Sequence, residues 1–185
     1  DMCLYGEKVV FNNCTFELAK GQYIWTYSAK EVAFNECTFN SAGKSVLIYH
    51  ENASVFNDVT VTKSTFNAST PVDGKAAIEM DSSLTAGIKL TIDSADVTVI
   101  ACDTNGGSCV WGYENSETII SAGTYKTNGG ETAVITSYGT LNITGGTYTQ
   151  AAGDSATYAI IVSDGTATIS GATVTGIHGA VGAIT

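Results

Sequence analysis

The chain has 185 residues, 44% of them apolar, which is enough for one domain with a continuous core. Eight lysines, no arginine and eighteen carboxylates give a formal net charge of −10, and a surface this acidic argues against nucleic-acid binding because phosphate backbones would be repelled. The single proline, Pro71, argues against a disordered linker, and no apolar run reaches the roughly 20 residues that cross a bilayer.

One pattern recurs seven times along the chain: an apolar residue, any residue, an apolar residue, two turn residues, a small residue, a polar residue, and an aromatic residue or Val. In chain order the copies read VVFNNCTF, VAFNECTF, VTVTKSTF, LTIDSADV, TIISAGTY, LNITGGTY and ATISGATV. Their third positions, which we call the anchors, are Phe11, Phe34, Val61, Ile92, Ile120, Ile143 and Ile169. Self-similarity at this period predicts a solenoid whose repeats stack on one another.

Three short strands are expected in each repeat. From the second repeat onward a first strand precedes the pattern, in YIW, VLIYH, AIEM, CVWGY, AVIT and AIIV. The second strand ends at the anchor, which alternates with a second inward residue as one buried strand face requires. A two-residue corner follows, where Gly and Asn tolerate left-handed dihedrals and where Glu36, Lys63 and Ala122 are expected to be strained.

The third strand follows the corner and points a small residue and then a large apolar one inward. The large residues are Phe16, Phe39, Phe66, Val97, Tyr125, Tyr148 and Val174. We therefore predict an all-β fold: a right-handed parallel β-helix of about seven rungs with three short strands per rung. It forms one domain over residues 1–185, and the partial repeats at both ends lead us to expect a segment of a longer protein.

The layout resembles the pectate-lyase-like superfamily of right-handed parallel β-helices across essentially the whole chain. The segments GTLNITGGTYT (139–149) and GTATISGATVT (165–175) resemble repeats of secreted and surface-attached bacterial proteins, including adhesins. Enzymes of that superfamily act on acidic polysaccharides from a groove along the first strand. Their Arg-based pattern and their paired aspartates are not found here, so the resemblance supplies no catalytic residue.

A candidate binding surface lies on the outer face of the first strand. If Ile24, Ile78 and Val110 point inward, the outward residues are Tyr23 and the six proposed ligand-binding residues: Trp25, Tyr27, Glu79, Asp81, Trp111 and Tyr113. Aromatic rings beside carboxylates suit sugars, which stack on rings and donate hydroxyl hydrogen bonds to acids. If the strand has the opposite parity, both tryptophans are ordinary core residues.

Catalysis would have to use Glu79, Asp81 and His50, with Lys75 and Asp103 on adjacent loops. An acid and a base about 5 to 9 Å apart could hydrolyse a glycoside, and stacked carboxylates could instead hold calcium. Acidic residues on an acidic surface are mostly solvated, however, and neither histidine belongs to a recognisable triad. The sequence therefore leans against an enzyme and predicts no metal site and no other cofactor.

The five cysteines cannot all pair within one chain. Cys14 and Cys37 occupy one inward row in neighbouring repeats, where buried thiols act as small apolar residues. Cys102 and Cys109 flank a loop that a disulfide could close, but no spacing fits a zinc motif. This usage favours a reducing or anaerobic setting.

The expected function is that of a non-enzymatic bacterial β-helix module, secreted or at the cell surface, that serves in adhesion or glycan binding. Its partner would be a polysaccharide or a host or cell-surface glycan, with no nucleic acid and no membrane insertion in this segment. A polysaccharide lyase or glycoside hydrolase and a purely structural spacer are the alternatives. The ligand, the neighbouring domains, any anchor and the oligomeric state stay open.

Overall fold

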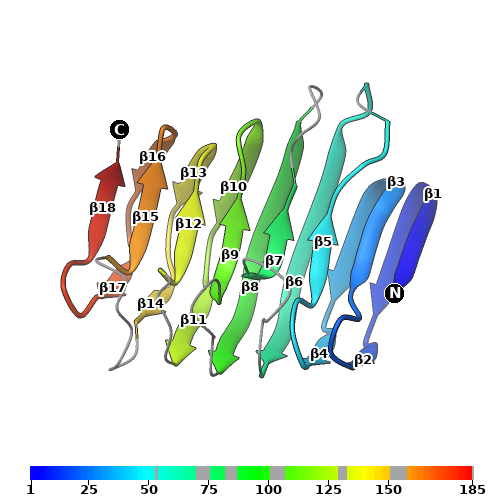
Figure 1. Ribbon diagram of the computed structural model, residues 1–185, viewed down its shortest axis with the longest axis horizontal. Coiled ribbons are helices and arrows are strands. Elements are labelled where there is room, and N and C mark those ends of the chain that lie inside the picture. Colours follow the sequence, from blue (N-terminus) through cyan, green and yellow to red (C-terminus); the bar gives the residue numbers. More distant parts are fainter. Residues whose placement is uncertain are drawn as a thin grey trace.

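A computed structural model describes residues 1–52, 54–69, 76–81, 87–100, 107–128, 133–150 and 158–184. Every regular element in these residues is a β-strand, and the strands join in one curled sheet of parallel pairings, a parallel β-solenoid (Figure 1). Within them, no helix long and apolar enough to span a bilayer occurs. The strands are β1 (Met2–Asn12), β2 (Thr15–Leu18), β3 (Ile24–Asn35), β4 (Thr38–Ser41), β5 (Val46–Ile48), β6 (Asn57–Ala68), β7 (Ala76–Met80), β8 (Ile88–Ile100), β9 (Ser108–Gly112), β10 (Ser116–Ile120), β11 (Gly123–Asn128), β12 (Ile135–Ser137), β13 (Thr140–Ile143), β14 (Thr147–Thr149), β15 (Ile160–Ser163), β16 (Thr166–Ile169), β17 (Thr173–Thr175) and β18 (Val181–Ile184).

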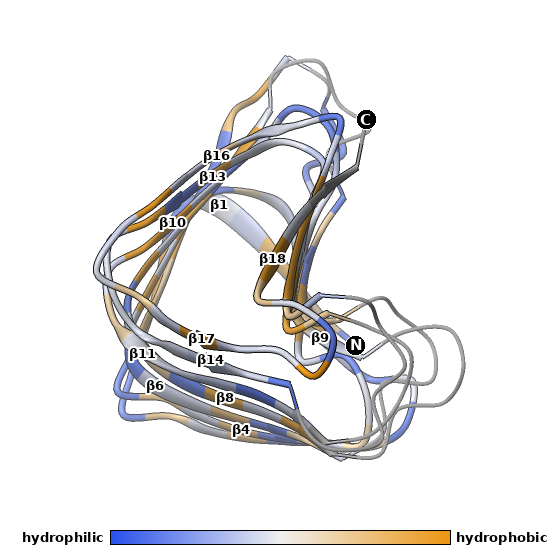
Figure 2. Ribbon diagram, turned by 90° about the vertical axis from the view of Figure 1, so that its left-hand side faces the viewer, coloured by the Kyte–Doolittle hydropathy of each residue, from blue (hydrophilic) through white to orange (hydrophobic). Residues whose placement is uncertain are grey.

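The parallel pairings fall into three series. The first-strand series continues from β3 through β5, β7, β9, β12 and β15 to β18. The second-strand series includes β1, β10, β13 and β16, and the third-strand series includes β2, β4, β11, β14 and β17. The long strands β6 and β8 bend around a corner and belong to both of these last two series. Seen end-on, the three series form the sides of the cross-section (Figure 2).

The predicted stacking of the anchors is confirmed. Each anchor lies opposite the next in the strand register, from Phe11 and Phe34 to Ile143 and Ile169. The large third-strand residues are aligned in the same way, and the rings of Phe39 and Phe66 stack 4.3 Å apart. These inward rows form one hydrophobic core along the solenoid, so each repeat buries its apolar face against its neighbours.

The corners differ from the prediction in one respect. Glu36 and Lys63 take the expected left-handed backbone, with φ of 54° and 47°. Ala122 does not, because in that corner the positive φ of 119° falls on the following residue, Gly123. Glycine adopts this region without the steric penalty of a Cβ atom, so the expected strain at Ala122 is absent and that prediction was wrong.

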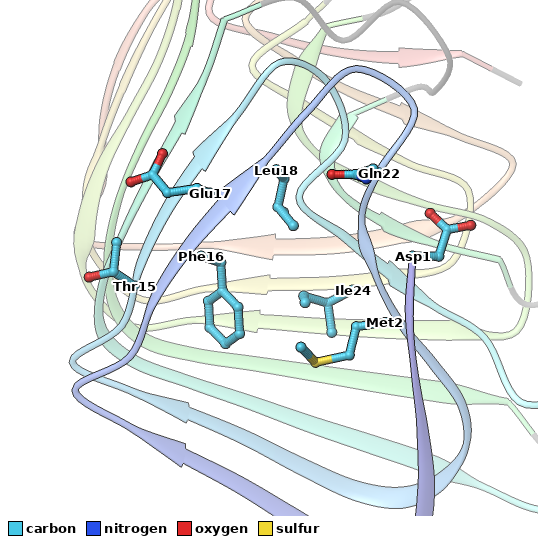
Figure 3. Close-up of a pocket in the computed structure, with 8 residues that line it drawn as sticks. All are labelled: Asp1, Met2, Thr15, Phe16, Glu17, Leu18, Gln22 and Ile24. Carbon is cyan, nitrogen blue, oxygen red and sulfur yellow. The ribbon is translucent and has the colours of Figure 1, made fainter.

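The solenoid is open at the N-terminal end of the described chain. A hollow of about 340 Å³ lies there, and Figure 3 shows Met2, Phe16 and Ile24 pointing into it while Thr15 and Glu17 point away. Phe16 and Ile24 are themselves core residues. The apolar core therefore forms part of the lining of this hollow.

Candidate functional site

The outer face of the first-strand series has the parity that the sequence argument assumed. Ile24, Ile78 and Val110 are buried in the core, at 0 to 1% exposure. The register then places Trp25 opposite Leu47, Leu47 opposite Glu79, and Glu79 opposite Trp111. These side chains form one outward row that crosses β3, β5, β7 and β9.

Aromatic rings gather at the N-terminal part of this face. Trp25 meets Tyr27 edge-on at 4.7 Å and lies 5.7 Å from Tyr49 and 6.4 Å from Tyr23, measured between ring centroids. Tyr5 extends the group, 5.4 Å from Tyr27. We call these five residues the first aromatic cluster. Trp25 and Tyr27 are half-buried, so the rings pack against one another while part of each residue stays exposed to solvent.

A second aromatic cluster consists of Trp111, Tyr113 and Tyr138. The Trp111 ring lies 6.2 Å from Tyr113 and 5.7 Å from Tyr138, and the two tyrosines stack at 6.4 Å with an interplanar angle of 18°. The sequence prediction missed Tyr138 and Tyr49. Each stands at the same position of its repeat as Tyr113, just after the first strand. Extending the alignment of the repeats to that position would therefore have found both tyrosines.

An ion pair separates the two clusters. Lys44 Nζ lies 2.9 Å from Glu79 Oε2, with 9% and 10% of the two side chains exposed, and 5.2 Å from the centroid of the Tyr23 ring. The Glu79 carboxylate therefore has a cationic partner on the face itself. Lys44 lies in the turn before β5, where no strand period points to it, and sequence reasoning missed it.

The structure brings together Glu79, Asp81, Trp111 and Tyr113. Burial, followed by the charges of Glu79 and Asp81, raises the pKa of the Tyr113 hydroxyl, as expected when carboxylates lie near an acidic group. In the first cluster, a hydrogen bond with Glu51 and the negative charge of the Glu51 carboxylate raise the pKa of Tyr27 to about 12. Each cluster thus combines apolar rings with a carboxylate, the combination proposed for sugar binding.

Among the catalytic candidates, Asp81 and His50 differ in their exposure to solvent. Asp81 is half-exposed, whereas His50 is only 4% exposed and its Nδ1 accepts a hydrogen bond from the Asn52 backbone N–H at 3.0 Å. Lys75, Cys102 and Asp103 lie outside the described residues. In the described part of the chain, no three His, Cys, Asp or Glu side chains form a group that could hold a metal ion.

Comparison of the chain with protein families, with curated proteins and with solved structures finds no match. The geometry of the face is therefore the basis on which function can be argued.

Proposed function

We propose that the chain is a right-handed parallel β-helix of about seven rungs with three short strands per rung, and that it serves as a non-enzymatic glycan-binding or adhesion module. The three series of parallel pairings support this architecture. Connections between parallel strands of one sheet are right-handed in about 98% of cases, which favours the right-handed form. The proposed location is the cell surface or the extracellular space of a bacterium.

The observation that carries the binding proposal is the pair of aromatic clusters on one rigid face. Trp25 and Trp111 are three strand steps apart, or about 14 Å at about 4.8 Å per step. A glycan chain that follows the solenoid axis could stack a sugar on each cluster. Rings present apolar area at a small entropic cost because they have few rotatable bonds.

The charge of the face favours a neutral glycan over a polyuronate. Glu51 and Asp81 lie beside the rings, and the whole chain carries a net charge of −10. Lys44, whose Nζ lies over the Tyr23 ring, is already paired with Glu79. Carboxylates accept hydrogen bonds from sugar hydroxyls but repel the carboxylates of a uronic acid polymer.

The enzyme alternative draws less support from the same geometry. A glycosidase needs an acid and a base on either side of the scissile bond, yet Glu79 is bound to Lys44 and His50 is buried. A lyase or hydrolase would release unsaturated or reducing sugar ends, and its activity would fall in Asp81→Asn. A structural spacer would bind no glycan.

The test is binding to a panel of neutral and acidic polysaccharides by affinity electrophoresis and calorimetry. We expect binding to a neutral glycan that falls at least tenfold in Trp25→Ala/Trp111→Ala, since each lost stacking contact costs about 1 kcal/mol or more. Phe56→Ala is the matched control, because Phe56 is an aromatic residue, 47% exposed, that belongs to neither cluster.

Because both tryptophans are half-buried, the binding of the double variant is interpreted only if it shows the parental thermal unfolding midpoint. Binding that survives in a folded double variant would remove the site from this face. If the chain binds no polysaccharide of the panel, the structural spacer would remain as the function.

A further inference from the structure

Two cysteines lie directly opposite one another in neighbouring repeats. Cys14 and Cys37 each follow a corner residue with positive φ, Asn13 at 52° and Glu36 at 54°. The Thr38 backbone N–H donates to the Cys14 carbonyl at 2.8 Å, and the residues that follow the cysteines, Thr15 and Thr38, are aligned partners of β2 and β4. The parallel ladder therefore holds the two cysteines side by side.

The Cα spacing of neighbouring strands falls within the range that a disulfide spans. Aligned residues of adjacent parallel strands lie about 4.8 Å apart, within the 4.4 to 6.8 Å that separates Cα atoms across a disulfide. The Cys37 thiol reaches toward the neighbouring repeat, where its Sγ lies 3.5 Å from the Phe11 carbonyl oxygen. The Cys14 thiol lies 3.4 Å from the Asn12 carbonyl of that same repeat.

The two thiols differ in access. Cys37 is 1% exposed and belongs to the core, whereas Cys14 is half-buried at its margin. Burial raises the pKa of the Cys37 thiol. An oxidant would therefore meet Cys14 first, and Cys37 would react second, as the resolving thiol.

We propose that Cys14 and Cys37 form a redox pair that a small-molecule disulfide, of the glutathione class, oxidises to an intramolecular disulfide that joins the first two repeats. This inference is independent of the proposed glycan binding. Cys3, by contrast, lies opposite Trp25.

The reaction balances in two exchange steps. The Cys14 thiolate attacks one sulfur of the small-molecule disulfide, whose S–S bond breaks and releases one small thiolate. The Cys37 thiolate then attacks Cys14 Sγ, breaks the mixed disulfide and releases the second small thiolate. Two protein thiols give up two electrons and two protons, and the small-molecule disulfide is reduced to two thiols.

The experiment exposes the reduced, folded chain to oxidised glutathione at about pH 8 and maps disulfides by peptide mass spectrometry. We expect a peptide pair linked through Cys14 and Cys37, and a thermal unfolding midpoint that rises by roughly 5 °C because closing the loop restricts the unfolded chain. Both effects should vanish in Cys37→Ser and persist in Cys3→Ser. Serine suits the buried position because Ser64 occupies the next place in the same row.

Two outcomes would overturn the proposal. One is a mixed disulfide at Cys14 that persists while Cys37 stays reduced in the folded chain. The other is a Cys14–Cys37 peptide that forms only after the chain has been unfolded with urea, which would show that the folded repeats do not bring the sulfurs together.

Discussion

At the scale of single residues, two tyrosine hydroxyls inside the core carry a testable consequence. Tyr125 and Tyr148 are fully buried and stack with ring centroids 4.9 Å apart. Each hydroxyl donates to a carbonyl three residues earlier, at Ala122 and Gly145, at 3.0 Å. A buried hydroxyl without a partner would be costly, so this local bond allows tyrosine to take the place that phenylalanine holds in earlier repeats.

These tyrosines predict a loss of stability in alkali. Burial raises the pKa of both hydroxyls above the unfolded value of 10.0. Above about pH 10 the unfolded chain loses these protons and the folded chain keeps them, so the free energy of unfolding falls with pH by up to about 1.4 kcal/mol per pH unit for each group. Urea unfolding at pH values from about 8 to 11.5 would measure this slope.

The matched comparison is Tyr125→Phe/Tyr148→Phe. We expect this variant to lose roughly 1 kcal/mol per missing hydrogen bond at neutral pH and to show a shallower decline in alkali than the parent. Tyr5→Phe is the control, because Tyr5 is 65% exposed. Parallel pH profiles for parent and double variant would mean that the two hydroxyls ionise in the folded state as freely as in the unfolded chain.

The candidate site shows what single residues reveal before a structure is known. The alternation of β3 and β9 puts Trp25 and Trp111 on the strand face opposite to Ile24 and Val110, and only the burial of these two residues shows that the tryptophans lie on the outer face. Lys44 could not be found in this way. It lies in a turn without periodicity, and its contact with Glu79 exists only because neighbouring repeats pack in one register.

At the scale of the elements, the corners determine how second and third strands meet. In the corner after Phe34 the left-handed residue is Glu36, and after Val61 it is Lys63. A side chain with a Cβ atom costs about 1 to 2 kcal/mol in this backbone region. The solenoid tolerates this cost because each corner is held by the strand pairings on both sides.

Replacing a left-handed corner residue with glycine should relieve this strain. Glu36→Gly and Lys63→Gly are each expected to raise the free energy of unfolding by up to about 1 kcal/mol, since the steric relief exceeds the entropy gained by the unfolded chain. Ala122→Gly is the matched control at the equivalent place in its repeat, where φ is not positive, and should destabilise. Chemical unfolding of the three variants measures these changes in the free energy of unfolding. Stabilisation by Ala122→Gly alone would contradict the prediction.

The sequence could predict that a corner exists but not always which residue turns. The two corner residues are Ser121 and Ala122 after Ile120, and Thr144 and Gly145 after Ile143. The positive φ values, however, belong to the residues that follow, Gly123 and Gly146. Between β6 and β8 the register shifts so that Thr62 lies opposite Ser94. Such one-residue adjustments arise from the fit between neighbouring repeats, which a single repeat does not contain.

At the scale of the whole molecule, the repeat period was the most informative signal. Because the pattern fixes which residues point inward, aligning seven copies was enough to predict the anchor row and the aromatic row, both of which the strand register confirms. The period left the parity of the first strand open, so it did not decide which face carries the proposed site. The ligand could not be predicted either, because binding depends on side chains that do not follow the period.

A solenoid of this kind should lose order repeat by repeat, since each repeat contacts only its neighbours. Phe39 and Val174 test this idea because they occupy the same inward row. Phe39 is fully buried and stacks on Phe16 at 4.7 Å and on Phe66 at 4.3 Å, whereas Val174, in the last repeat, is half-buried. Truncating a buried phenylalanine to alanine costs about 3 to 5 kcal/mol, and truncating a half-buried valine far less.

We therefore expect Phe39→Ala to lower amide hydrogen-exchange protection strongly in β2, β4 and β6 and only weakly in β13 to β17. Val174→Ala should affect β14 and β17 alone. Exchange followed by mass spectrometry resolves these segments, because local opening is measured separately for each peptide. If either variant lowers protection by the same factor from β1 to β18, the solenoid opens as a single cooperative unit, and the stacking energy is shared along the whole core.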